Sequence, residues 1–339
     1  MTRPLRVVAR VHAYPPTHNA GAEWTLHELL RALAARGHRP EVWLSQWTPD
    51  EDPYDVDGVH VIPAAAAGTR FPRAAARADA LVSHLECVPE TACLARGHGR
   101  PLVVLAHNTF ELTWEPLIAG TVALAVYNSE WMRTAAGERL AGAPRRPDRE
   151  LVVRPPVHPG DYRVRRGGGR HITLINSTLS KGAGVLGELA ARMPQRRFLA
   201  VRGGYGEQVP PDAANVEVVD QVPGRDLPAA VYARTRILIM PSDYESWGRA
   251  GVEAMASGIP VIAHPTEGLK ESLGDAGLFC DRGDIGAWHK AIEQLDDPAV
   301  YRAASARARA RSTQLDPTAE LDTWCRTVEE VCGARTAAR

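Results

Sequence analysis

Short apolar runs alternate with amphipathic stretches along most of this chain, and this alternation constrains its fold more than any other sequence feature. Leu5–Val11 is the first apolar run and predicts a buried strand. The stretch after it has leucines at the i, i+3, i+4 and i+7 positions of one helix face, namely Leu26, Leu29, Leu30 and Leu33. Gly37 is suited to end that helix, and Glu41–Ser45 predicts the next strand. Such alternation is typical of a parallel sheet covered by helices.

The further strand candidates fall into two series. The first consists of Val59–Ile62, Ala80–His84, Leu102–Ala106 and Val122–Tyr127, and the second of His171–Ile175, Arg197–Val201, Val216–Val219, Ile237–Met240 and Pro260–Ala263. Between them, Pro, Gly and Arg cluster in Arg154–Gly160 and Arg165–Arg170, which indicates a linker. Because 339 residues exceed the usual size of one core, we expect two Rossmann-like domains, over residues 1–157 and 170–315. We expect a last helix, at about residues 316–333, to pack back on the first domain.

Composition and charge exclude several classes of protein. The 40 basic and 40 acidic residues leave no net charge, so the chain lacks the basic excess of a typical nucleic-acid-binding protein. It has no run of about 18 apolar residues that would span a membrane, and we expect a cytoplasmic protein. The arginine-rich stretches Arg70–Arg77 and Arg145–Arg146 are interpreted as solvated faces in preference to contacts with a membrane surface.

The cysteines, histidines and glycines predict no metal and no cofactor. The 5 cysteines are an odd number without a C-x-x-C pair, and the 12 histidines show no H-E-x-x-H spacing. The glycine-rich Arg202–Gly206 follows a strand but does not continue into a G-x-G-x-x-G pattern, which argues against a nicotinamide cofactor.

The segment from Ile237 to Gly286 carries the most chemical information. After its first strand comes a turn that contains Glu245, and a helix is predicted to begin near Ser246 or Trp247. Glu253 follows eight residues after Glu245, a separation of roughly 12 Å along a helix. That is about the distance between the sugar and the ribose of a sugar nucleotide. The free N–H groups of the helix start would suit the diphosphate between them, and Gly248 would allow its close approach.

This segment closely resembles the donor-binding signature of glycosyltransferase family 4, the group 1 glycosyl transferases. Weaker resemblances follow in the family's order at Gly21-Ala22-Glu23, Leu102–Asn108, Ala125–Glu130 and Ser180-Lys181-Gly182. Together these segments span most of the chain, although only the C-terminal one is highly specific. The resemblance implies the GT-B fold, in which two doubly wound parallel-sheet domains face a central cleft. It also implies a metal-independent enzyme that transfers a sugar with retention of configuration.

The resemblance also assigns roles to the donor-binding residues. It implies that Glu253 accepts hydrogen bonds from the ribose, while Glu245 holds the transferred sugar and favours positive charge at its anomeric carbon. Lys181 would neutralise the leaving diphosphate together with the amides of Ser246-Trp247-Gly248. Many relatives carry an arginine a few residues before this lysine, whereas this chain has Asn176–Ser180 there. Arg249 or Arg202 is a candidate for the missing charge.

In the N-terminal half, the resemblance implies a catalytic or donor contact for His107 and close approach of the donor to the backbone at Gly21. The acceptor, a small molecule or a glycan precursor, could meet His12, Asn19 and Glu23 near the same loop. The expected activity is therefore hexosyl transfer from a nucleotide-diphosphate sugar. Two alternatives remain: a sugar-nucleotide epimerase or hydrolase on the same fold, and a catalytically silent protein that binds nucleotide sugars.

Overall fold

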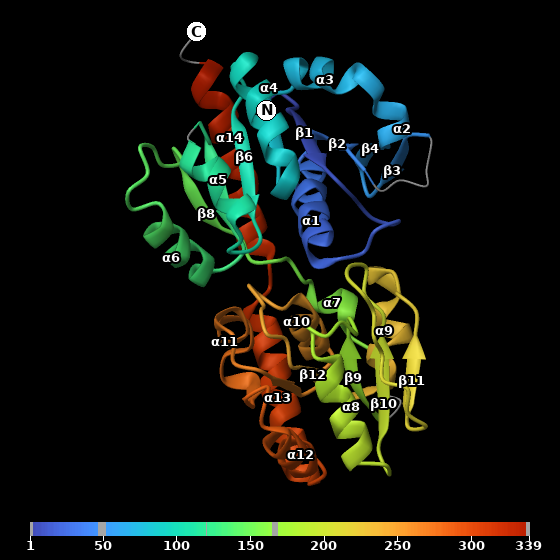
Figure 1. The fold of residues 1–339 in the computed structure, drawn as a ribbon. Coiled ribbons are helices and arrows are strands. Elements are labelled where there is room, and N and C mark those ends of the chain that lie inside the picture. Colours follow the sequence, from blue (N-terminus) through green and yellow to red (C-terminus); the bar gives the residue numbers. More distant parts are fainter. Residues whose placement is uncertain (1–2, 47–51, 120, 165–168, 337–339) are drawn as a thin grey trace. The chain divides into compact units, whose positions relative to one another are not determined.

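The structure is a computed structural model that describes residues 3–46, 52–119, 121–164 and 169–336. The chain divides into two compact units (Figure 1). The first unit consists of Met1–Pro156 together with Pro317–Arg339, and the second of Val157–Asp316. Of the expected linker, the part from Arg165 to Gly168 lies outside the described residues.

The first unit is built on an eight-stranded sheet with the order β3-β4-β2-β1-β5-β6-β7-β8. Its strands are β1 Arg6–Val11, β2 Arg39–Leu44, β3 Tyr54–Val56, β4 Val59–Ile62, β5 Ala80–Ser83, β6 Leu102–Ala106, β7 Leu124–Tyr127 and β8 Glu150–Val152. Neighbouring strands are parallel except for β3 and β4, which form an antiparallel hairpin that the apolar pattern did not predict. The hairpin turns at Asp57 (φ 48°) and Gly58 (φ 81°), a pair suited to tight two-residue turns.

Helices cover both faces of this sheet. They are α1 Gly21–Ala35, α2 Ala64–Ala67, η1 Gly68–Arg70, α3 Phe71–Arg77, η2 Leu85–Cys87, α4 Val88–Gly97, α5 Glu111–Ala119, α6 Glu130–Arg139 and α14 Thr318–Thr336. The leucine stripe of α1 packs on one face together with α14 (Figure 1), where Trp324 Nε1 donates to the carbonyl oxygen of Leu29 at 2.9 Å. Side chains of α3 to α6, such as Phe71 and Trp114, pack on the other face. Both faces are therefore apolar, as expected for a buried parallel sheet.

The second unit has a six-stranded, fully parallel sheet with the order β11-β10-β9-β12-β13-β14. The strands are β9 His171–Ile175, β10 Arg197–Val201, β11 Val216–Val219, β12 Thr235–Met240, β13 Val261–Ala263 and β14 Gly277–Phe279. The order reverses between β9 and β12, as in a doubly wound nucleotide-binding domain. Ligands of such sheets bind beyond the carboxyl ends of the strands at this switch point.

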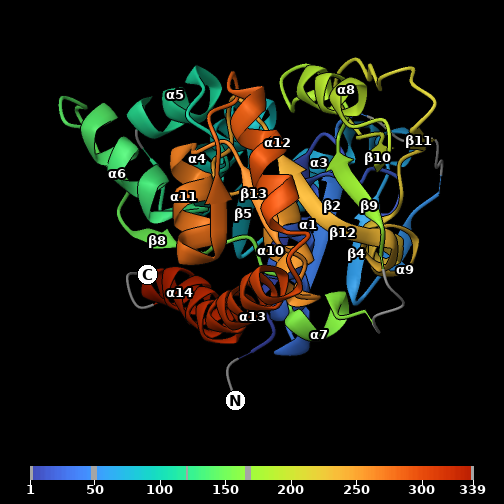
Figure 2. The same cartoon turned by 90° about the horizontal axis from the view of Figure 1, so that it is seen from below.

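The helices of the second unit lie on both faces of its sheet (Figure 2). They are α7 Pro159–Tyr162, α8 Ala183–Arg192, η3 Gly224–Asp226, α9 Leu227–Ala230, η4 Tyr232–Arg234, α10 Arg249–Ala256, α11 Glu267–Leu273, η5 Gly274–Ala276, α12 Ile285–Gln294 and α13 Pro298–Gln314. One face packs on α8 and α12, with Trp288 fully buried. The other face packs on α7, α10, α11 and α13, and includes Met240 and Met255.

The start of α10 differs from the prediction. The helix begins at Arg249, so Ser246 and Trp247 precede it, and the estimate of roughly 12 Å for eight helical residues does not apply. Gly248 is the residue before the helix and has φ 83°, a left-handed conformation that glycine adopts without strain. A Cβ atom at Gly248 would lie 2.3 Å from Leu269 Cδ2, which is a second reason for glycine there.

Candidate functional site

Lys181 and Glu245 form an ion pair at the switch point of the second unit. Lys181 lies in the loop after β9, and Glu245 in the loop after the neighbouring strand β12. Lys181 Nζ is 2.5 Å from Glu245 Oε1, and the two side chains are 28% and 17% exposed. A cation and a carboxylate thus lie together where an α/β sheet of this order binds its ligand.

Local contacts fix both members of this pair. The Ser242 hydroxyl donates to Glu245 Oε1 at 3.0 Å, and the backbone N–H of Lys181 donates to Thr178 Oγ1 at 3.2 Å. Gly182 has φ 100°, and a Cβ atom there would lie 2.2 Å from Pro241 Cγ. The two loops therefore touch at a point where only glycine fits. Sequence reasoning missed the role of Ser242, although a polar residue two positions after the end of an apolar strand was a usable signal.

The loop of Glu245 also packs closely on helix α11. A Cβ atom at Gly268 would lie 2.3 Å from the carbonyl carbon of Ser246 and 2.4 Å from the carbonyl oxygen of Glu245. The Thr266 hydroxyl donates to the same oxygen at 3.4 Å. The start of α11 therefore packs against the backbone of Glu245 and restricts its position.

Replacing Gly268 by alanine is expected to destabilise the protein by about 1–3 kcal/mol, because the new methyl group overlaps backbone atoms that cannot move aside easily. Gly184→Ala is the matched control, since Gly184 also lies near a helix start and a Cβ atom there meets nothing within 4 Å. The control should leave stability unchanged or raise it by up to about 1 kcal/mol. Urea unfolding measures both, and equal stability of the two variants would contradict the close packing.

Glu253 is buried in a polar network of the second unit. Its Oε2 accepts a hydrogen bond from the Tyr232 hydroxyl at 2.7 Å, and its Oε1 accepts one from Arg249 Nε at 2.6 Å. Arg249 Nη2 donates in turn to the Tyr162 hydroxyl at 3.0 Å. The Glu253 residue is 4% exposed. Both carboxylate oxygens thus already have a donor, and each retains one further lone pair for a ligand.

The other residues predicted to bind the donor are dispersed in the second unit. Arg249 is committed to Glu253, with a side chain 9% exposed. Arg202 lies at the end of β10 and pairs with Asp220 at 3.4 Å. Trp247 is 2% exposed and belongs to the apolar core, whereas Ser246 is partly exposed. Arg249 and Arg202 are therefore paired with Glu253 and Asp220, respectively. Sequence reasoning missed Tyr162 and Tyr232, because aromatic residues outside the motif carry no distinctive signal.

In the first unit, three histidines follow three adjacent strands, β1, β5 and β6. His107 Nε2 is 3.0 Å from His84 Nδ1, and the rings of His84 and His12 have centroids 5.7 Å apart. His12 lies between two carboxylates, 3.3 Å from Glu23 Oε1 and 3.1 Å from Glu86 Oε1. Two of the predicted acceptor residues therefore pair directly, and His107 pairs with His84, which the sequence analysis did not single out.

The charge states of the three histidines differ. Burial lowers the pKa of His107 to about 4, although the charge of Glu23 acts in the opposite direction. Burial and the neighbouring His107 lower the pKa of His84 well below its usual value. For His12, burial opposes protonation, but the hydrogen bond to Glu23 and the charge of Glu86 outweigh it and raise the pKa. Near neutral pH, His107 is therefore an uncharged hydrogen-bonding group.

The lowered pKa of His107 predicts a loss of stability in acid. Between the pKa of the unfolded chain, about 6.5, and the folded value of about 4, the unfolded state binds the extra proton, so stability falls as the pH decreases. The expected slope for this histidine is up to about 1.4 kcal/mol per pH unit. Urea unfolding of wild type and His107→Asn between these pH values measures it. A variant with the same pH dependence as wild type would contradict the assignment.

The remaining predicted residues of the first unit lie around the loop after β1. Gly21 is the first residue of α1, and a Cβ atom there would meet nothing within 4 Å, so the packing of the chain does not itself require glycine. Asn19 Nδ2 donates to the carbonyl oxygen of Pro16 at 2.6 Å, and its Oδ1 accepts from Trp24 Nε1 at 3.1 Å. Asn19 therefore shapes this loop.

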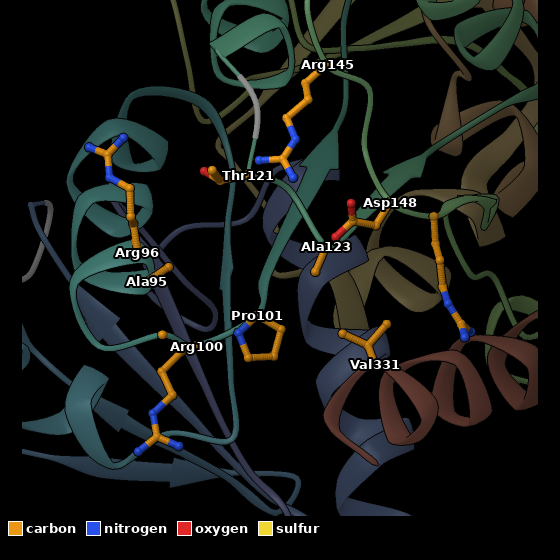
Figure 3. A pocket seen from close by; sticks show the side chains of 11 residues that line it. Ala95, Arg96, Arg100, Pro101, Thr121, Ala123, Arg145, Asp148 and Val331 are labelled. Carbon is orange, nitrogen blue, oxygen red and sulfur yellow. The ribbon is translucent and has the colours of Figure 1, made fainter. Parts of the chain in front are cut away.

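A basic pocket of about 500 Å³ lies at the amino-terminal edge of the first sheet, away from the strand ends that carry the histidines (Figure 3). Its lining includes four arginines, Arg96, Arg100, Arg145 and Arg149. They do not converge on one point. Arg96 and Arg100 extend in opposite directions (Figure 3), Arg100 donates to the carbonyl oxygen of Ala76 at 2.6 Å, and Arg149 pairs with Glu330. This pocket contains none of the predicted site residues.

In the described part of the chain, no group of three or more His, Cys, Asp or Glu side chains is arranged to hold a metal ion. None of the helices described there is both long enough and apolar enough to cross a membrane.

Comparison with known proteins supports the expectations for the second unit. Residues 213–311 match the family model described as "Glycosyl transferases group 1". This segment includes Glu245 and Glu253. It extends from before β11 to near the end of α13. This segment is therefore similar to the group 1 glycosyl transferases.

Curated relatives match over part of the chain. The O-antigen chain mannosyltransferase B of Escherichia coli is 38% identical over 101 residues, which are 30% of this chain and 26% of that protein. The D-inositol 3-phosphate glycosyltransferase of Pseudarthrobacter chlorophenolicus is 35% identical over 150 residues, 38% of this chain and 36% of that protein. The match thus spans about a quarter to a third of the length of these relatives.

Solved structures match over nearly the whole chain and show the fold. Sucrose-phosphate synthase of Thermosynechococcus elongatus superimposes with a TM-score of 0.75 at 16% identity, covering 98% of this chain and 100% of that one. The Anabaena protein HepE in complex with UDP-glucose gives a TM-score of 0.75 at 17% identity, with 97% and 100% covered. The expected GT-B fold is therefore confirmed.

Proposed function

We propose that this chain is a retaining, metal-independent glycosyltransferase of family 4, which transfers a hexosyl group from a nucleotide-diphosphate sugar to a hydroxyl group of an acceptor. The observation that carries the proposal is the Lys181–Glu245 ion pair at the switch point of the second sheet. The similarity of the segment around Glu245 to the group 1 glycosyl transferases supports the reaction class. The solved HepE structure with UDP-glucose supports a sugar nucleotide as donor.

In the proposed reaction, Lys181 holds the diphosphate and stabilises the negative charge that develops on it as the glycosidic bond breaks. The amides of Ser246, Trp247 and Gly248 add hydrogen bonds to the same phosphates. Glu245 binds a hydroxyl of the transferred sugar and stabilises positive charge at the anomeric carbon. Glu253 uses its remaining lone pairs for the ribose, with Arg249 and Tyr232 fixing its orientation.

Retention follows if the acceptor oxygen attacks the face from which the diphosphate leaves. The acceptor hydroxyl then gives its proton to the departing phosphate oxygen, its oxygen forms the new bond to the anomeric carbon, and the old bonding electrons leave with the diphosphate. This route needs no enzymic nucleophile. A neutral His107 suits a hydrogen bond to a sugar hydroxyl in this step, since its lowered pKa keeps it uncharged.

For the acceptor, we propose a small hydroxyl-bearing molecule without a phosphate group. The loops that follow β1, β5, β6 and β7 contain no Lys or Arg within residues 12–24, 84–90, 107–115 and 128–132. They contain Glu23 and Glu86, which flank His12. Carboxylates in such loops would repel a phosphate. In this respect the acceptor would differ from that named for the D-inositol 3-phosphate glycosyltransferases.

Thermal-shift screening with UDP-, GDP-, ADP- and dTDP-sugars tests the donor, because a ligand that binds the folded state raises its apparent stability. The stabilising donor is then incubated with matched neutral and phosphorylated polyols, with and without EDTA. We expect a glycoside of the neutral polyol, with the anomeric configuration of the donor in its NMR spectrum, at an unchanged rate in EDTA. Free sugar as the sole product would favour a hydrolase, and binding without turnover would favour a silent nucleotide-sugar-binding protein.

A further inference from the structure

Arg282 joins the loops that carry Lys181 and Glu245. It lies in the turn between β14 and α12, and its side chain reaches the loop after β9. Arg282 Nη1 donates to the carbonyl oxygen of Ser180 at 3.0 Å, and Nη2 donates to that of Leu179. The same guanidinium is 3.2 Å from Asp243 Oδ2, in the loop after β12. One side chain thus holds two loops that are far apart in the sequence.

The bonded groups are immediate neighbours of the proposed catalytic pair. Ser180 precedes Lys181, and Asp243 lies two residues before Glu245. The carbonyl oxygen of Ser180 also accepts the backbone N–H of Asp243 at 3.0 Å, so two donors converge on it. The geometry suits arginine, because its planar fork presents several N–H groups in fixed directions, whereas a lysine ammonium is a compact charge on a flexible stem.

The turn that carries Arg282 is itself anchored. The backbone N–H of Arg282 donates to His264 Nδ1 at 3.1 Å, and His264 N donates to the carbonyl oxygen of Met240 at the end of β12. Trp288 Nε1 donates to the carbonyl oxygen of Asp281 at 2.8 Å. The backbone of Arg282 is therefore restrained by hydrogen bonds. Its side chain in turn restrains the two loops that it contacts.

We propose that Arg282 is a positioning residue, which holds the Lys181 and Glu245 loops at the separation where their side chains form the ion pair. The proposal rests on the function proposed for that pair, but its structural content can be tested without substrate. Arg282 acts through the carbonyl oxygens and Asp243, and does not need to touch the donor.

The first test observes Lys181 directly. The whole chain has three lysines, Lys181, Lys270 and Lys290, so selectively labelled lysine gives a simple NMR spectrum. An ordered Lys181 side chain should show two inequivalent Hε signals in wild type. In Arg282→Met these signals are expected to merge as the side chain becomes mobile. Arg196→Met is the matched control, since Arg196 is also 28% exposed and pairs with Asp296 elsewhere in the unit. It should leave the Lys181 signals unchanged, and unchanged signals in Arg282→Met would overturn the proposal.

The second test uses kinetics with the donor found by thermal shift. Arg282→Met is expected to lower kcat by about 10- to 100-fold with KM for the donor changed less than about threefold, because the catalytic geometry is lost while most donor contacts remain. Arg282→Lys should recover only part of kcat. If Arg282→Met acted through a general loss of structure, its melting temperature would fall well below that of Arg196→Met. If no donor is turned over but the Lys181 signals change as stated, the proposed function fails and the positioning role stands.

Discussion

Replacing Lys181 by methionine is expected to lower kcat for sugar transfer by about 10² to 10³-fold, the usual effect of removing one group that stabilises charge in a transition state. Methionine keeps the length and apolar stem of the side chain but removes the cation. The ion pair with Glu245 is partly exposed, so its loss should change the free energy of unfolding by less than about 1 kcal/mol. Initial rates at saturating donor, together with urea unfolding, measure both quantities.

Lys270→Met provides the matched control for Lys181. Lys270 also pairs with a glutamate, Glu267, at 2.7 Å, but on the outer surface of α11 with its side chain 50% exposed. The control should retain at least about half of the wild-type kcat. An active Lys181→Met enzyme would show that the switch-point cation does not support departure of the diphosphate, and would remove the main support for the proposed mechanism.

Replacing Glu253 by alanine is expected to destabilise the protein by about 3–5 kcal/mol, because it leaves Arg249 as a buried charge without its carboxylate. The side chains of Arg249 and Glu253 are only 9% and 6% exposed, so water cannot easily take over the lost contacts. The Tyr232 hydroxyl loses its acceptor as well. Urea unfolding measures the effect. Because a domain has only about 5–15 kcal/mol of stability in total, Glu253→Gln provides a milder variant that keeps the shape.

A double variant separates the stabilising role of Glu253 from its proposed contact with ribose. Arg249→Met combined with Glu253→Leu replaces the buried ion pair by apolar groups of similar size, a change that is often neutral for stability. We expect this variant to recover at least about half of the stability lost in Glu253→Ala, yet to show no thermal shift with the donor. Normal donor binding by the double variant would mean that Glu253 is structural only.

The alternation of apolar runs and helix-patterned stretches was sufficient to predict the strands that form the centre of each sheet. Leu102–Ala106 and His171–Ile175 agree with β6 and β9 residue for residue. The short strands β3, β8 and β14 were missed, because three residues seldom carry a period that can be recognised. The start of α10 was placed too early because the left-handed Gly248 interrupts a sequence that otherwise has a helical composition.

By itself, the sequence determined the fold class and the residue types of the candidate donor site, since burial imposes regular spacing on apolar residues and the motif around Glu245 and Glu253 is local. Only the tertiary structure decided which of these groups meet. Lys181 and Glu245 are 64 residues apart, and Arg282 lies farther still along the chain. They come together because parallel strands bring all their carboxyl ends to one edge of the sheet. Sequence spacing contains no record of that convergence, so Arg282 and Tyr232 could be recognised only in three dimensions.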